Sequence, residues 1–141
     1  MAMHGQSLET KASPEAVWRL WSAPETWPTW NPDVTAISLN GPFAAGTTGS
    51  MTTKRGGAHP ITLEEVQAGK GFQLCTKAMP GTTFHFKCEI VPLGSRGSRI
   101  SQSISMTGGL APLFSAMMGG NIAKSFEPIL KGLAAKAEAS A

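Results

Sequence analysis

The 141-residue sequence contains no tyrosine, two cysteines and few charged side chains. The lack of tyrosine excludes a phenol as a catalytic acid. The two cysteines, Cys75 and Cys88, form neither a CxxC pair nor another metal-ligand spacing, and two thiols cannot specify a disulfide framework. Charged residues make up 15% of the chain, below the roughly 25% of average globular proteins, so small and hydroxyl residues must cover much of the surface.

Long hydrophobic runs and dense basic patches are also missing. No stretch approaches the roughly 20 apolar residues of a membrane span, and the first residues lack the features of a signal peptide. We therefore expect a cytoplasmic protein with no integral membrane association. The 12 Lys and Arg residues are scattered rather than interleaved with aromatics, which predicts no nucleic-acid partner. The length suits one domain over residues 1–141.

Residues that could carry chemistry do not gather into a motif. No Ser-His-Asp order, metal-ligand triad or phosphate-binding glycine motif stands out, so we expect no catalytic residue, no metal and no cofactor. His85 alternates with Lys87 and Glu89 and should lie on a solvated strand face. Glu64 and Glu65 are neighbours, and neighbours on a strand point to opposite faces, so at most one could enter a cavity.

The start of a first helix is well marked. Ser13 offers an N-cap hydroxyl, Pro14 fits the first helical position, and Glu15 places an acid in the first turn. Weak alternation over residues 6–11 predicts a short strand before this helix. Three prolines within residues 24–32 allow only one further short helix, in a corner that leads to the next strands.

Antiparallel strands are predicted for the middle of the chain. From residue 34 to 108 the hydrophobic period is close to two and turn signals recur about every ten residues, which is typical of a meander. The clearest strands are residues 83–91 and 99–107, each with one apolar and one polar face.

The hairpin over residues 72–90 allows a prediction of register. Directly paired residues share a face, so an inward register for both strands needs an odd loop, and we favour three residues that include Pro80-Gly81. This register places Cys75 and Cys88 on opposite faces, where they cannot form a disulfide.

Beyond residue 108 the period returns to 3.6, and apolar side chains follow one face as far as Leu133. A long amphipathic helix should therefore close the chain. Gly119-Gly120 and Pro128 are poor helix formers, so we expect a bend near one or both.

Four segments follow one another in a distinctive order: residues 12–18 (ASPEAVW), the corner at 27–32, the turn at 46–49 (GTTG), and the strand at 100–108 that leads into the last helix. In this order they resemble the START-like (SRPBCC) superfamily, in its polyketide cyclase/dehydrase and lipid-transport branch. The resemblance implies an α+β helix-grip fold. Its curved antiparallel sheet of six to seven strands wraps around a long C-terminal helix, with two short helices between the first two strands.

The resemblance also implies a hydrophobic cavity between the sheet and the last helix, although the same apolar residues could instead fill a solid core. Gln102 is the main polar candidate, because an amide among apolar neighbours must bond the protein, a water or a ligand. Carried over by position, the ligand-binding residues would be Trp30, Met51, Leu74, Thr76, Phe84, Phe86, Gln102, Ile104 and Met106 from the sheet side, and Phe114, Met117, Met118 and Ile122 from the helix.

Fold does not decide function in this superfamily, because some members bind lipids, sterols, polyketides or hormones and only some are enzymes. We favour binding of a small hydrophobic or amphipathic molecule, such as a lipid, a polyketide or an aromatic compound, with Gln102 and Thr76 orienting it. A polyketide cyclase or dehydratase that uses the same cavity is the alternative. A helper domain that binds a protein partner is a third possibility, and a monomer and a homodimer are both compatible with the sequence.

Overall fold

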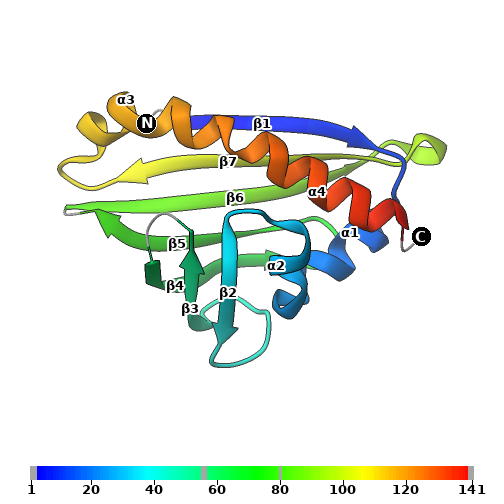
Figure 1. The fold of residues 1–141 in the computed structure, drawn as a ribbon, viewed down its shortest axis with the longest axis horizontal. Coiled ribbons are helices and arrows are strands. Elements are labelled where there is room, and N and C mark those ends of the chain that lie inside the picture. Colours follow the sequence, from blue (N-terminus) through cyan, green and yellow to red (C-terminus); the bar gives the residue numbers. More distant parts are fainter. Residues whose placement is uncertain (1–2, 55–56, 80, 140–141) are drawn as a thin grey trace.

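A computed structural model describes residues 3–54, 57–79 and 81–139 (Figure 1). The chain begins with strand β1, followed by helices α1 and α2 with a short 3-10 turn, η1, between them. Six strands and two helices complete it, with a second 3-10 turn, η2, before the last strand. The bounds are β1 Met3–Thr10, α1 Pro14–Trp21, η1 Pro24–Thr26, α2 Trp27–Trp30, β2 Val34–Leu39, β3 Thr48–Thr53, β4 Gly57–Gln67, β5 Gly71–Met79, β6 Thr82–Pro92, η2 Gly94–Arg96, β7 Ser98–Thr107, α3 Ala111–Lys124 and α4 Phe126–Ala139.

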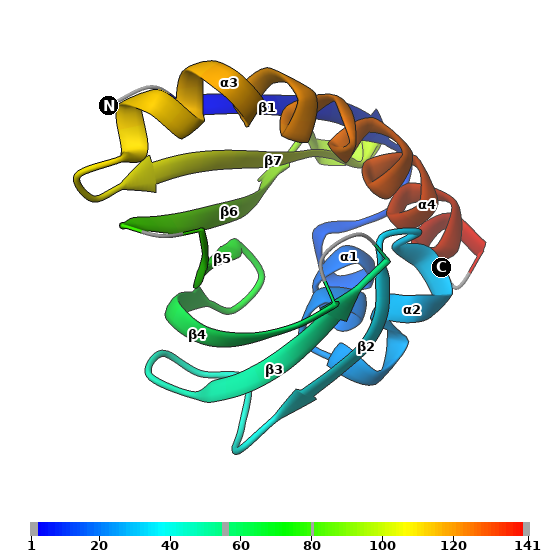
Figure 2. The same cartoon turned by 60° about the vertical axis from the view of Figure 1, so that its left-hand side comes forward.

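The seven strands form one antiparallel sheet in the order β1-β7-β6-β5-β4-β3-β2. The sheet is strongly curved, and α3 and α4 run along β1 and β7 on its concave side (Figure 2). Register shifts in β2, β4 and β5 show where bulges interrupt the ladder. Bulges increase local twist and bend a strand, so they help this half of the sheet curl back toward the helices. The predicted helix-grip fold is confirmed.

Helix α1 begins where the sequence predicts. The Oγ of Ser13 accepts a hydrogen bond from the backbone N–H of Ala16 at 3.2 Å, and Pro14 occupies the first turn. This cap satisfies one of the backbone donors that a helix leaves free at its start. Val17 and Trp21 lie on the buried face, so α1 is held against the core at one end of the sheet.

The register between β5 and β6 also agrees with the prediction. Phe72 pairs with Cys88 and Thr76 with Phe84, so both strands present these side chains to the concave side. A register shift between Thr76 and Met79 produces this alignment rather than the predicted three-residue loop, since Met79 already pairs with Thr82. Residue 80 of that loop lies outside the described residues. Both cysteines are free, with Cys88 buried and Cys75 half-buried.

The C-terminal helix is interrupted once, at Ser125. Helix α3 passes through Gly119-Gly120 without a break, and α4 begins at Phe126. Pro128 thereby falls in the first turn of α4, where a backbone N–H has no helical acceptor, so the proline removes no hydrogen bond. Of the two predicted bend sites, the chain uses the one near Pro128. Within the described residues, no helix has the length and hydropathy needed to cross a membrane.

Candidate functional site

A half-enclosed cavity of about 480 Å³ lies between the concave face of the sheet and the helices. Its wall combines side chains from α1, α2, the link from α2 to β2, strands β2 to β7, and the helices α3 and α4 around their junction. Most of the wall is apolar. The lining residues are Trp21, Trp27, Trp30, Asn31, Asp33, Val34, Met51, Thr53, His59, Phe72, Leu74, Thr76, Phe84, Phe86, Cys88, Gln102, Met118, Ile122, Ser125, Phe126 and Ile129.

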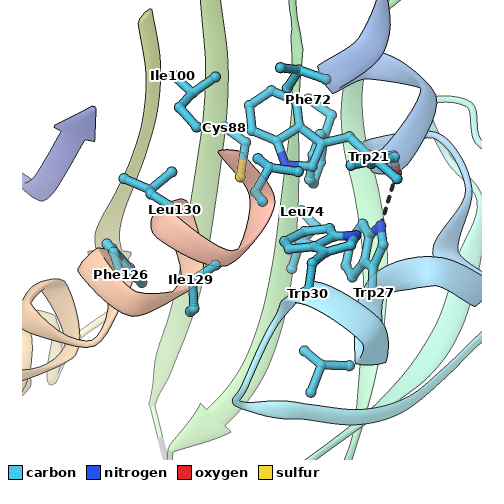
Figure 3. Packing of buried hydrophobic residues seen from close by; sticks show 14 of the residues in the cluster. Trp21, Trp27, Trp30, Phe72, Leu74, Cys88, Ile100, Phe126, Ile129 and Leu130 are labelled. Atoms are coloured by element: carbon cyan, nitrogen blue, oxygen red, sulfur yellow. Dashed lines mark hydrogen bonds between the residues drawn. The ribbon is translucent and has the colours of Figure 1, made fainter. Parts of the chain in front are cut away.

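Three tryptophans from α1 and α2 form one end of the cavity (Figure 3). The Nε1 of Trp27 donates to the carbonyl of Trp21 at 3.0 Å, and the Nε1 of Trp30 donates to the Oγ1 of Thr26 at 3.2 Å. Phe72 packs edge-on against Trp21, with ring centroids 5.5 Å apart. Because both indole donors are satisfied within the protein, the wall that the rings of Trp27 and Trp30 contribute is apolar.

Helix α4 supplies the wall opposite the tryptophans. Phe126 and Ile129 line the cavity, and Figure 3 shows them on the helix that faces α2. Two contacts fix the position of this helix. Its Gly132 lies against the backbone carbonyl of Trp30, and near its end Glu138 accepts a hydrogen bond from the Oγ1 of Thr10 at 2.5 Å.

Gln102 is a polar side chain that the cavity leaves available on its β7 side. Its strand β7 pairs it with Cys88 on one side and Gln6 on the other, all on the concave side. In the described part of the chain, no group hydrogen-bonds the Gln102 amide, and none of its polar atoms is sealed from solvent without a partner. Thr76 differs, because its Oγ1 already donates to the carbonyl of Pro60 at 2.8 Å. The amide can therefore bond a guest at little cost.

Groups that could move protons are few in the cavity. Asp33 and His59 line it from the start of β2 and from β4, far along the sheet from Gln102. Burial, together with the charge of Glu89, raises the pKa of the Cys88 thiol, which keeps it protonated and unreactive. Across the described ranges, no group of three His, Cys, Asp or Glu side chains is placed to hold a metal ion.

The structure brings together most of the residues predicted for the ligand site. Those that line the cavity are Trp30, Met51, Leu74, Thr76, Phe84, Phe86, Gln102, Met118 and Ile122. Ile104 and Met106 are buried against the helices but do not reach the cavity, and Phe114 is half-buried at the margin of the core. Met117 does not line the cavity as predicted, because its side chain is 64% exposed. Neighbouring helical residues differ by about 100° around the axis, and here that rotation turns Met117 toward solvent while Met118 lines the cavity.

Several lining residues were missed. Trp21, Trp27, Phe126 and Ile129 line the cavity but are not among the residues predicted for it. The helical period cannot show whether an apolar face packs against a side chain or borders a cavity. His59 pairs with Met51 across β3 and β4 and shares its face, so a correct register for this hairpin would have identified it.

The outer face of the sheet carries a separate polar network. The Nδ1 of His85 lies 2.7 Å from Glu64, and its Nε2 lies 2.8 Å from the Oγ1 of Thr107. The Nε2 of Gln73 also donates to Glu64 at 3.0 Å. His85 is on the outer face as predicted, but it is held by partners rather than solvated alone. The network joins β4, β5, β6 and β7.

The predicted opposite orientation of Glu64 and Glu65 does not hold. The register shifts between Leu63 and Glu65, so Glu65 pairs with Gln73 while the bulged Glu64 also reaches outer-face partners. Neither carboxylate lines the cavity. Partial burial raises the pKa of Glu64, but hydrogen bonds from Gln73 and His85 and the charge of His85 outweigh it, so the pKa ends below its usual value.

Comparisons with known proteins agree with this architecture. A solution structure from Thermobifida fusca is 20% identical, covers 97% of this chain and 93% of its own, and has a TM-score of 0.74. Truncated norcoclaurine synthase from Thalictrum flavum is 16% identical, with coverage of 94% and 91% and a TM-score of 0.72. Ara h 8.0201 is 16% identical, with coverage of 98% for both chains and a TM-score of 0.73. At these identities the likeness shows the fold alone.

No curated protein matches the sequence. The model of one family, described as polyketide cyclase / dehydrase and lipid transport, matches residues 5–138. That match spans the sheet, both short helices and nearly all of the C-terminal helix. The chain therefore belongs to the polyketide cyclase/dehydrase and lipid-transport family.

Proposed function

We propose that the protein binds a small hydrophobic or amphipathic molecule in the cavity between the sheet and helices α3 and α4. The observation that carries this proposal is a half-enclosed space of about 480 Å³ whose wall is largely aromatic and aliphatic. Ligand pockets commonly fall between about 300 and 1,000 Å³ and combine an apolar wall with a few polar groups. A guest that buries about 200 Å² of apolar surface gains about 5 kcal/mol, before the cost of association.

A protein of the same fold binds small aromatic molecules, which supports aromatic compounds as candidate guests here. A structure of norcoclaurine synthase from Thalictrum flavum holds dopamine and hydroxybenzaldehyde. The present cavity offers a comparable guest the aromatic side chains of Trp27, Trp30 and Phe84, and aromatic rings pack well against such walls.

The alternative function, a cyclase or dehydratase, needs groups that transfer protons. Within the described lining, Asp33 and His59 are the candidates, since Cys88 is held protonated by burial. Both lie on the β2 and β4 side of the cavity, and β5 and β6 separate β4 from the strand of Gln102 in the sheet order. An enzyme of this kind would lose turnover in Asp33→Asn or His59→Gln while retaining the guest. We favour binding because the described wall offers few ionisable groups, and they come from strands remote from Gln102 in the sheet order.

The test uses two neighbouring methionines on α3. Met118 lines the cavity and Met117 is exposed, so Met118→Trp should fill the space while Met117→Trp adds the same bulk outside it. Native mass spectrometry and thermal unfolding would be measured for the wild type and both variants with lipids, sterols and aromatic polyketides. We expect an adduct and a higher melting temperature for the wild type and Met117→Trp, and neither for Met118→Trp.

Two outcomes would overturn the proposal. One is a panel in which no compound binds the wild type. The other is undiminished binding by a folded Met118→Trp variant, which would place the guest elsewhere.

A further inference from the structure

The described wall of the cavity carries no basic side chain apart from a histidine. No described lining residue is a lysine or an arginine, and Asp33, His59 and Cys88 are the ionisable side chains of the wall. Lys54 lies close by in the chain, with its backbone N–H bonded to the carbonyl of Asp33 at 3.0 Å, but its side chain is exposed and does not line the cavity. A negative charge on a guest would therefore meet no fixed positive partner among the described residues of the wall.

Burying an anion without a partner is costly. A carboxylate or sulfonate that leaves water loses its hydration, and only a cation or several hydrogen-bond donors can replace it. If the guest turned round and left its anion on the side of Asp33, it would face a carboxylate instead. In either orientation, a negatively charged guest is therefore disfavoured relative to an uncharged guest of the same shape.

Gln102 suits an uncharged polar group. Its amide supplies both donors and an acceptor, and no described residue uses them. A carbonyl, hydroxyl, amide or amine N–H can match this amide without a net charge. Between Gln102 on β7 and His59 on β4 lie strands β6 and β5, whose Phe84, Phe86 and Leu74 line the wall. The wall holds a second neutral amide, Asn31, whose Oδ1 accepts from the backbone N–H of Asp33. Gln102 therefore offers a neutral polar contact on the β7 side, followed by a broad apolar stretch.

We infer that the cavity selects uncharged hydrophobic molecules with a hydrogen-bonding group that meets Gln102, and rejects carboxylates and sulfonates of the same shape. This inference rests on the proposed binding function and names its ligand class. Free fatty acids and acidic aromatics would then be poor guests, whereas neutral ring compounds, amides and alcohols would be good ones.

The test compares two dyes with one ring system. N-phenylnaphthylamine is uncharged and carries an N–H, and anilinonaphthalene sulfonate adds a sulfonate. Fluorescence titration of the folded wild type at pH 8 should give an affinity for the neutral dye roughly tenfold or more above that for the sulfonate. Equal binding, or tighter binding of the sulfonate, overturns the charge selection and leaves the binding function standing. Failure of both dyes to bind overturns the binding function as well.

Substitutions at position 102 test whether the preference for the neutral dye depends on Gln102. Gln102→Lys supplies the missing cation, so its affinity for the sulfonate dye should rise roughly tenfold. Gln67→Lys adds the same charge at an exposed site away from the cavity and should leave both affinities unchanged. Gln102→Leu should weaken the neutral dye by roughly fivefold through the lost hydrogen bond. Unchanged dye preference in a folded Gln102→Lys variant would show that Gln102 does not face the guest, while an unfolded variant leaves the wild-type comparison decisive.

Discussion

The carbonyl oxygen of Trp30 lies 2.1 Å from the position that a Cβ at Gly132 would occupy. Helix α4 can approach α2 this closely because residue 132 has no side chain. The contact sets the distance between Ile129 and Trp30, two residues that line the cavity from opposite sides. A glycine far along the sequence from the tryptophan corner therefore helps to set the width of the candidate site.

The first prediction concerns this glycine. Gly132→Ala should lower the free energy of unfolding by about 2 kcal/mol, because a methyl group would overlap a backbone carbonyl that cannot turn away easily. Gly120→Ala in α3 is the matched control, since nothing lies within 4 Å of its Cβ position. That variant should gain about 0.8 kcal/mol from helix propensity. Urea denaturation measures both, and a Gly132→Ala variant as stable as the wild type would contradict the close contact.

The second prediction concerns Ser98, which is fully buried and donates to the carbonyl of Ala12 at 2.9 Å. Ser98→Ala should cost about 1 to 2 kcal/mol, because it removes a buried hydrogen bond that ties β7 to the segment before α1. Ser101→Ala, in the same strand but half-buried on the outer face, should change stability by less than about 0.5 kcal/mol. The midpoint of urea unfolding distinguishes them, and equal losses would mean that the Ser98 bond adds nothing.

The third prediction concerns pH. The folded state lowers the pKa of Glu64, so the stability from this carboxylate is fully present above its usual pKa of 4.5 and is lost as the pH falls through the lower folded value. Glu64→Gln should therefore lose less stability than the wild type when the pH is taken from 6 to about 3. Glu65→Gln removes an exposed neighbouring charge and should keep the wild-type dependence. Parallel acid unfolding curves for all three proteins would contradict the network around His85.

The fourth prediction concerns the thiols. Burial raises the pKa of Cys88 and, with the charge of Glu64, also that of Cys75, so both should react slowly with a thiol reagent at pH 8. Cys75 is half-buried on the outer face and should react first, whereas Cys88 should react only in denaturant. The Cys75→Ser variant should show almost no reaction in the native state. Rapid labelling of Cys88 in that variant would indicate a cavity more open than the structure describes.

Much of the fold could be predicted because its signals are local. The Ser13 cap depends on residues within one turn, and the faces of β6 and β7 follow from strict alternation of apolar and polar side chains. The bulge at Glu64 could not be predicted in this way, because an inserted residue shows only in the pairing of β4 with β5. The bulge brings the carboxylate of Glu64 to His85, a contact that simple alternation does not predict.

The candidate site was predicted less completely. Alternation identifies Phe84 and Phe86 as inward-facing, but it gives the same result for Ile104, which is buried without reaching the cavity. On α3 the apolar stripe was too broad to separate Met118 from Met117. An apolar side chain has the same signature in sequence whether it meets another side chain or a space.

The amino-acid sequence by itself determined the order of the elements, the cap of the first helix and the concave faces of the strands, because each depends on the spacing of nearby residues. Only the tertiary structure decided that a cavity exists, which side chains line it and that the Gln102 amide has no partner among the described residues. Those features depend on distances between elements far apart in the chain, such as that between Gly132 and Trp30. Such distances are set by the packing of the whole fold, and no local pattern records them.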